Sequence, residues 1–288
     1  MIARSALTEA GNDSRKKAAR RRLSRTRFLQ SENHNGQIAP KYLVFHYTAC
    51  NAAAASAAFL RKTGANRVSA HLLVDRDGSV TQFVPFNRRA WHAGESQWDG
   101  FQDLNTHSIG IEVVNFGYLL KSADGTFRTA EGAQIVPPAD VTEGRHRLPH
   151  WPWTHWHAYT AEQIATCEAL AELLATNYAL RDAVGHDDIA PSRKSDPGPS
   201  FPMSRMRSHI VGRDTAEVDE QIAYVAVDKL NIRVGAGVAS SIAGPPLVRN
   251  RRLEMLGPNS NGWMQVTVRQ PAPLTGWVRA EYTADHVT

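Results

Sequence analysis

Apolar and polar positions in the first two thirds of the chain predict several β-strands. Residues 42–47 form a short apolar, β-prone run, and residues 109–115 form another. Residues 69–74 and 79–84 alternate on either side of residues 75–78, and the Asp-Gly pair in that turn is typical of a β-hairpin.

Two segments between and after these runs predict helices. The alanine-rich residues 51–62 have Asn51 as a possible N-cap. Thr160 and Gln163 have the spacing of a capping box, and apolar residues at helical spacing continue to about Tyr178. The fold class predicted for this part is α/β, with a mixed central β-sheet flanked by helices.

The pattern changes beyond about Arg213. Short strand-like segments with glycines recur at residues 228–237, 261–266 and 275–278. They predict a second part, built of short β-strands, after the α/β domain.

Residues 184–203 are a helix-poor run that reads as an active-site loop. Four prolines and two glycines fix its path. His186, Lys194 and Asp196 lie in it, and the last two are two residues apart, which places them on one face of an extended segment.

A histidine and a carboxylate are incomplete ligands for a metal, and His46 at the end of the 42–47 run is the best third donor. Two histidines and one carboxylate leave a fourth tetrahedral position for water, which is the catalytic form of a zinc site. Cys50 is an alternative donor, although a small buried thiol fits it better. Asp187 and Asp188 are alternative carboxylates, for which turn-capping is the better interpretation.

Charge is concentrated in the N-terminal arm. The chain has 288 residues and a net charge of +5, and nine of its 33 Lys and Arg residues, but only two of its 28 acidic residues, lie in residues 1–27. Such an arm can bind an anionic surface, but a solvated, flexible arm is the preferred interpretation, and nucleic acid is an unlikely partner. No apolar run approaches the ~18 to 20 residues of a spanning helix. Residues 24–29 are similar to a twin-arginine export signal, but polar residues follow, so no export signal is expected.

Five blocks of sequence, in order, carry a resemblance to a known family. They are residues 45–49 (FHYTA), 69–78 (SAHLLVDRDG), 90–94 (AWHAG), 105–112 (NTHSIGIE) and 185–199 (GHDDIAPSRKSDPGP). The chain resembles the zinc-dependent N-acetylmuramoyl-L-alanine amidases, which include phage lysozyme-type amidases, cytosolic anhydromuropeptide amidases and peptidoglycan recognition proteins. The resemblance covers roughly residues 40–205.

The resemblance implies a role for each matching residue. His46, His186 and Asp196 match the zinc ligands, Glu112 matches the general base and Lys194 the group that stabilises the oxyanion. His71 matches a histidine outside the metal shell. Some branches of the family have a tyrosine immediately before that histidine, where this chain has Ala70, so more of the polar work falls on Glu112.

Several aromatic residues are candidates for contact with substrate. His92 is expected either to face substrate or to lie behind a metal ligand. Trp98 lies in a Gly- and Asp-rich loop and can stack on a sugar or cover an edge of the core. Trp153 lies in an irregular insertion, residues 117–157, which is either a wall that grips the substrate or a compact flank.

The expected organisation is a basic arm (residues 1–38), a catalytic domain (39–212) and a further domain (222–286). The last resembles bacterial SH3-like wall-binding modules, with Ala236 where proline is common, and the resemblance implies a small all-β barrel. By resemblance, the chain hydrolyses the amide between N-acetylmuramic acid and L-alanine in peptidoglycan or muropeptides. The alternative is a non-catalytic peptidoglycan-binding protein. The protein is expected to be cytoplasmic as made and to act on the wall if phage lysis or specialised secretion delivers it.

Overall fold

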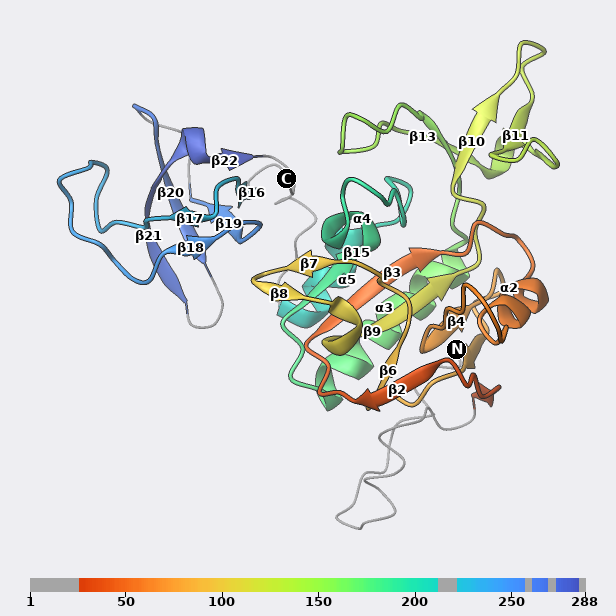
Figure 1. Ribbon diagram of the computed structural model, residues 1–288. Coiled ribbons are helices and arrows are strands. Elements are labelled where there is room, and N and C mark those ends of the chain that lie inside the picture. Colours follow the sequence, from red (N-terminus) through yellow and green to blue (C-terminus); the bar gives the residue numbers. More distant parts are fainter. Residues whose placement is uncertain (1–25, 212–221, 257–260, 269–272, 285–288) are drawn as a thin grey trace. The chain divides into compact units, whose positions relative to one another are not determined.

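The computed structural model describes residues 26–211, 222–256, 261–268 and 273–284 (Figure 1). The chain divides into two compact units, Met1–Glu95 with Asp103–Arg213, and Ser96–Gln102 with Asp214–Thr288. The segment Ser96–Gln102 therefore belongs to the second unit, although the sequence on both sides of it belongs to the first. The basic residues 1–25 lie outside the described residues.

A six-stranded mixed sheet forms the centre of the first unit. Four neighbouring strands are parallel, and β5 pairs antiparallel with β4 through the hairpin that the sequence predicts. The order is β1 (Arg27–Phe28), β5 (Val80–Gln82), β4 (Leu72–Val74), β9 (Ser108–Val113), β3 (Tyr42–Tyr47) and β15 (Asp182–Gly185). A further pair, β2 (His34–Gln37) and β6 (Arg88–Ala90), lies outside this sheet.

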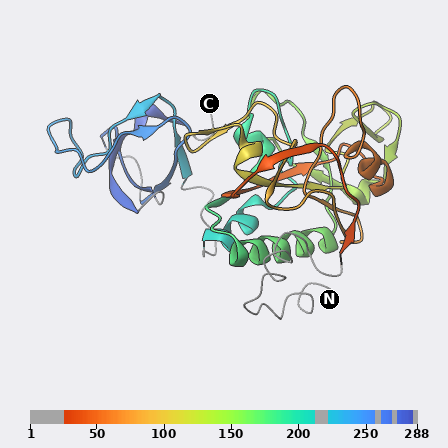
Figure 2. The ribbon, with the colours of Figure 1, turned by 60° about the horizontal axis from the view of Figure 1, so that its bottom comes forward.

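Helices pack against the sheet because side chains alternate between its faces. Leu43, Phe45, Ile109 and Ile111 share one core with helices α3 (Ala161–Asn177) and α5 (Met203–Val211). Figure 2 shows α3 running along that face. A second core, around Leu73 and Val114, packs against α2 (Ala53–Phe59). The predicted α/β arrangement is confirmed for this unit.

The two predicted helices differ in how they begin. Thr160 caps α3 in a capping box with Gln163, as expected. The prediction for the earlier helix is wrong at its start, because the N-cap of α2 is Ala52 and no side chain caps it. Asn51 is thus outside the helix.

The insertion forms a sheet of its own, so the prediction of an irregular segment is wrong. Its five short antiparallel strands follow the order β12 (Ile135–Val136), β11 (Phe127–Thr129), β10 (Tyr118–Lys121), β14 (His155–His157) and β13 (Val141–Glu143). Strands of two to four residues leave too little alternation for a pattern to show.

The second unit is all-β in its described part. Its antiparallel sheet has the order β21 (Leu274–Arg279), β20 (Trp263–Val268), β19 (Arg252–Met255), β16 (Ile222–Val225) and β22 (Thr283–Ala284). Two further pairs are β17 (Lys229–Leu230) with β18 (Leu247–Val248), and β7 (Gln97–Trp98) with β8 (Phe101–Gln102). Val225, Leu253, Val266 and Val278 form a separate apolar core. None of the helices in the described residues is long and apolar enough to cross a membrane.

Candidate metal centre

Two histidines lie at the carboxyl ends of neighbouring parallel strands. His46 is near the end of β3, and His186 follows directly after β15 as the first residue of the short helix α4 (His186–Ile189). The strands pair in register up to Gly185 and Phe45, so the chain delivers both imidazoles to the same edge of the sheet.

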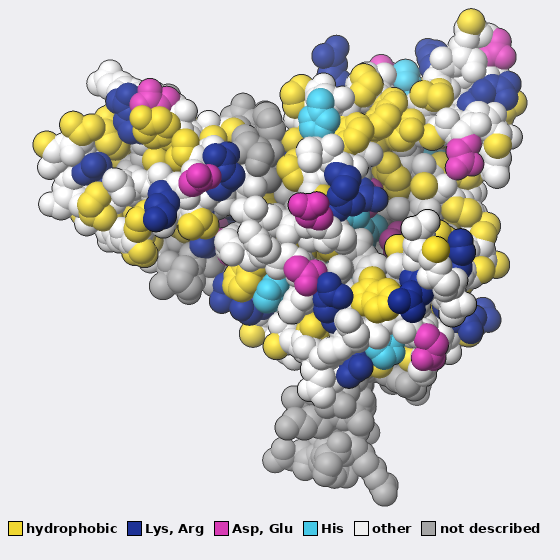
Figure 3. All heavy atoms as spheres, viewed as in Figure 1, with side chains coloured by type: hydrophobic (Ala, Val, Ile, Leu, Met, Phe, Trp, Pro, Cys, Tyr) yellow, Lys and Arg dark blue, Asp and Glu magenta, His cyan; other side chains and the backbone are white. Residues whose placement is uncertain are grey.

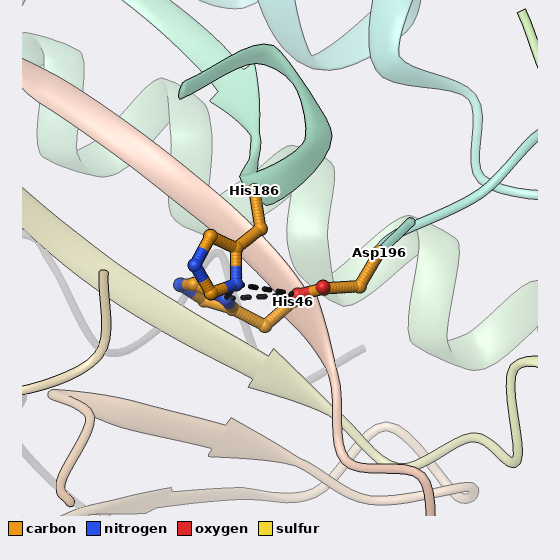
Figure 4. A group of neighbouring side chains, drawn as sticks. All are labelled: His46, His186 and Asp196. Atoms are coloured by element: carbon orange, nitrogen blue, oxygen red, sulfur yellow. Dashed lines mark hydrogen bonds and ion pairs between the residues drawn. The ribbon is translucent and has the colours of Figure 1, made fainter. Parts of the chain in front are cut away.

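The proline-rich loop brings a carboxylate to the same point. Asp196 Oδ2 lies 2.9 Å from His186 Nδ1 and 3.0 Å from His46 Nδ1, and the two nitrogens are 2.9 Å apart. Figure 4 shows the three side chains pointing toward one another from separate elements. They are the one group of three possible metal ligands found among the described residues.

The charges at this point depend on burial. Burial and the neighbouring His186 lower the pKa of His46 to about 4, so the imidazole stays neutral at ordinary pH. Burial acts to raise the pKa of Asp196, but His186 and His46 outweigh it and hold that pKa below its usual value. Neutral imidazoles and an ionised carboxylate are the protonation states that bind a metal.

The donor set has the chemistry of a catalytic zinc site. Two imidazole nitrogens and one carboxylate oxygen are common zinc ligands, and three protein ligands leave a position for water or substrate. The outer nitrogen of each imidazole already has a partner. His186 Nε2 donates to the carbonyl oxygen of Ala93 at 3.0 Å, and His46 Nε2 lies 3.0 Å from His92 Nδ1. The residues therefore fit a zinc ion.

Glu112 lies beside this group. It pairs in register with His46 across β9 and β3, and its Oε2 is buried without a hydrogen-bond partner among the described residues. Burial, reinforced by Asp196, raises the pKa of Glu112 to about 8, although Lys194 opposes the shift. A buried carboxyl with an unused oxygen is costly unless a ligand or substrate completes it.

A cavity of about 670 Å³ opens over the group. His46, Glu112, His186, Lys194 and Asp196 all line it. Its other walls include apolar side chains of α2 and the residues after it, together with Glu131 from the insertion. Figure 3 shows hydrophobic side chains gathered beside Lys and Arg on this face.

Tyr47 also lines the cavity, and sequence reasoning did not single it out. Its hydroxyl lies 2.9 Å from Ser195 Oγ. Burial and the charge of Asp196 raise its pKa, so the phenol remains a neutral hydrogen-bond donor. Its position directly after His46 is the only signal in the sequence.

The two carboxylates that follow His186 in the sequence hold its turn in place through hydrogen bonds and ion pairs. Asp188 accepts from the Gly185 backbone N–H, which agrees with turn-capping, and it pairs with Arg147 and Arg207. Asp187 pairs with Arg147 and with His146, which also comes from the insertion. The insertion thus anchors the turn that carries His186.

The structure separates the remaining candidates. His92 is buried against His46 and also lines the cavity, so both of its expected roles stay predictions. Trp98 is 2 % exposed and packs against Tyr224, which leaves no open face for a sugar. Trp153 is half-buried and stacks between Tyr118 and Trp151 in the insertion.

Cys50 is outside the group of possible ligands. The expectation of a buried thiol is wrong, because the residue is half-exposed and lines the cavity. His71 is buried and hydrogen-bonded to the backbone of Arg88 and Gly110, which confirms a structural role.

These features define the class: an α/β protein with a His–His–Asp donor set at the carboxyl ends of parallel strands. The sequence profile described as N-acetylmuramoyl-L-alanine amidase matches residues 36–199. This is more than half of the chain, which therefore belongs to that family.

Individual relatives match between about half and three fifths of the chain. It is 36% identical over 151 residues to the 1,6-anhydro-N-acetylmuramyl-L-alanine amidase AmpD of Escherichia coli, covering 52% of this chain and 61% of AmpD. It is 32% identical over 183 residues to the N-acetylmuramoyl-L-alanine amidase AmiD of the same organism, covering 60% of this chain and 54% of AmiD. The chain thus spans less than two thirds of either relative.

One similar solved structure is a complex of E. coli AmiD with the substrate anhydro-N-acetylmuramic acid-L-Ala-D-gamma-Glu-L-Lys. It has a TM-score of 0.46 and 29% identity, covering 73% of this chain and 71% of that one.

Proposed function

We propose that this chain is a zinc-dependent amidase that hydrolyses the amide between N-acetylmuramic acid and the L-alanine of a stem peptide. One observation carries the proposal. The donor atoms of His46, His186 and Asp196 converge in a cavity that Glu112 also lines, and among the described residues the buried Oε2 of Glu112 has no hydrogen-bond partner. A protein that only bound the wall would need neither feature.

A zinc ion held by His46, His186 and Asp196 would supply Lewis acidity and an activated water at this point. Glu112 accepts the proton of the attacking water and passes it to the leaving amine of L-alanine. Burial raises the pKa of Glu112 above its usual value, which strengthens this carboxylate as a proton acceptor. The backbone of Glu112 is held in β9, beside the strand that carries His46.

Lys194 lines the same cavity two residues before Asp196. Its ammonium stabilises the negative charge that develops on the carbonyl oxygen as water attacks. The neutral phenol of Tyr47 shares a hydrogen bond of 2.9 Å with Ser195, which lies between these two residues in the sequence. The base and the oxyanion-stabilising group thus come from different elements and line the same cavity.

The substrate we propose follows from the names of the relatives. AmpD is described as acting on 1,6-anhydro-N-acetylmuramyl-L-alanine, and AmiD as an N-acetylmuramoyl-L-alanine amidase. The substrate class is therefore a soluble muropeptide or the peptidoglycan itself. A soluble substrate agrees with action where the chain is made, and an intact wall requires delivery by lysis or specialised secretion.

We propose that the second unit is an SH3-like module that binds wall peptides. Its short antiparallel strands and separate apolar core support this assignment. Tethering such a module to a catalytic unit raises the local concentration of substrate. A wall-binding module favours the intact wall over free muropeptides as the target.

The test is digestion of purified peptidoglycan and of a soluble anhydromuropeptide, with and without a chelator, followed by mass analysis. Free stem peptides that begin with L-alanine are expected from the untreated enzyme and not after chelation. A Glu112→Gln variant should release stem peptides far more slowly than the wild-type enzyme. If the protein sediments with the wall while sugar and stem stay joined, it is a binding protein and the proposal is wrong.

A further inference from the structure

His92 lies behind His46, on the side away from the other donors. Its Nδ1 is 3.0 Å from His46 Nε2, while His46 Nδ1 faces His186 and Asp196. Its ring also packs directly over Gly110, where a Cβ atom would come within 2.4 Å of it. His46, His92 and Ser108 are all buried, so water does not replace these contacts.

The protons in this row can be assigned from the carbonyl at its far end. A carbonyl oxygen only accepts, so Ser108 Oγ–H donates to Leu104 O, at 2.5 Å. Ser108 Oγ must then accept from His92 Nε2–H, 3.4 Å away. A neutral His92 with its proton on Nε2 has a lone pair on Nδ1, and that lone pair accepts from His46 Nε2–H. His46 Nδ1 is left with the lone pair that a metal requires.

The next residue does the same for the second histidine. The carbonyl oxygen of Ala93 accepts from His186 Nε2–H at 3.0 Å, which leaves the lone pair on His186 Nδ1. Asn105 Oδ1 accepts from the backbone N–H groups of both His92 and Ala93, at 2.9 and 2.8 Å. One buried amide therefore holds the two consecutive residues that set both imidazoles.

We propose that His92 is a positioning residue that fixes the proton of His46 on Nε2, so that His46 and His186 both present Nδ1 to the metal. The inference rests on the zinc site proposed above. In this role His92 does not bind the metal itself. It acts through His46, as outer partners of metal-binding histidines generally do.

The first test measures zinc affinity by competition with a chromophoric chelator, using metal-free protein reloaded with zinc. His92→Leu removes the acceptor, and we expect affinity to fall about 10- to 100-fold. In His92→Asn the carboxamide oxygen is as many bonds from the backbone as Nδ1, so it can accept the same proton. That variant should bind zinc within about threefold of wild type.

The matched control is His71→Asn. His71 is also buried, and among the described residues its ring hydrogen bonds go to the backbone of Arg88 and Gly110. It should keep wild-type zinc affinity. The inference is wrong if His92→Leu binds zinc as tightly as wild type, if His92→Asn loses as much as His92→Leu, or if the control loses as much as either. Wild-type protein that binds no zinc would instead overturn the proposed metal site.

A second measurement needs no variant and stands if His92→Leu does not fold. Long-range nitrogen–proton correlation spectra of ¹⁵N-histidine-labelled, zinc-loaded protein report which ring nitrogen carries each proton. We expect the proton on Nε2 in His46, His92 and His186. A proton on Nδ1 of His92 overturns the inference.

Discussion

His46 and Glu112 are register partners on the neighbouring parallel strands β3 and β9. Partners in register on parallel strands project from the same face of a sheet. The backbone pairing that builds the sheet thus also sets the distance between a metal ligand and the proposed base.

Glu112→Gln tests the proposed base, because it keeps the shape of the side chain but cannot accept a proton. We expect kcat to fall by about 10²- to 10⁴-fold, with zinc content unchanged by elemental analysis. Glu131→Gln is the matched control, since Glu131 lines the same cavity and has no part in the proposed mechanism. A zinc-loaded Glu112→Gln enzyme with near wild-type kcat would remove Glu112 from the mechanism.

Glu112 also makes the stability of the metal-free protein depend on pH. Burial first, and Asp196 second, raise its pKa to about 8, whereas an unfolded chain has a Glu pKa of about 4.3. Between these values the folded protein holds a proton that the unfolded chain has lost. Glu112 therefore lowers the free energy of unfolding more and more as pH rises toward 8.

The measurement is urea unfolding of chelator-treated protein at pH 5 and pH 8. Wild type should lose stability from pH 5 to pH 8 through Glu112, whereas Gln cannot ionise. The free energy of unfolding of Glu112→Gln, taken relative to wild type, should therefore be higher at pH 8 than at pH 5 by about 2 to 4 kcal/mol. Glu131→Gln should show no such growth, because Glu131 is exposed. A gain that is equal at both pH values would mean that Glu112 is not held protonated in the fold.

Lys194 is tested by its charge. Lys194→Met should lower kcat by about 10²- to 10³-fold with a small change in KM, because an oxyanion-stabilising group acts mainly in the transition state. Lys194→Arg keeps the charge and should recover part of the loss. If Lys194→Met raises KM and leaves kcat unchanged, Lys194 only binds the substrate.

The sequence was sufficient to single out the three proposed metal donors because each has a local signal. His46 lies at the end of a strand-like run, and His186 and Asp196 lie in a loop whose prolines and glycines predict its path. The structure brings the three side chains together as expected.

What the sequence did not show depends on contacts between distant residues. The place of His92 behind His46 requires Ser108 and Asn105, and nothing near His92 in the sequence indicates them. Trp98 is buried by Tyr224, more than a hundred residues away. Local patterns cannot distinguish a loop tryptophan that faces a ligand from one that another segment covers.

Asp188 connects the insertion to the turn below His186. Its carboxylate is buried and pairs with Arg147 at 2.8 Å and with Arg207 at 2.7 Å. Asp188→Ala leaves buried Arg207 without this partner, so we expect a loss of about 3 to 5 kcal/mol in the free energy of unfolding. Asp77→Ala, at an exposed hairpin turn, is the comparison and should cost far less. A small loss in Asp188→Ala would show that the ion pairs do not hold the turn.

A variant of Trp98 distinguishes a structural role of this residue from the substrate contact that the sequence suggested. It is almost fully buried against Tyr224, and the neighbouring Asp99 pairs with Arg251, all within the second unit. Trp98→Ala should therefore cost about 3 to 5 kcal/mol in the stability of that unit. Hydrogen exchange in β20 and β21 should become faster, and kcat/KM on a soluble muropeptide should not change. Trp153→Ala, which alters a half-buried stack in the insertion, should leave exchange in those strands as it is. If Trp98→Ala instead leaves exchange unchanged and weakens binding to the wall, the indole contacts a ligand and its packing against Tyr224 does not stabilise the unit.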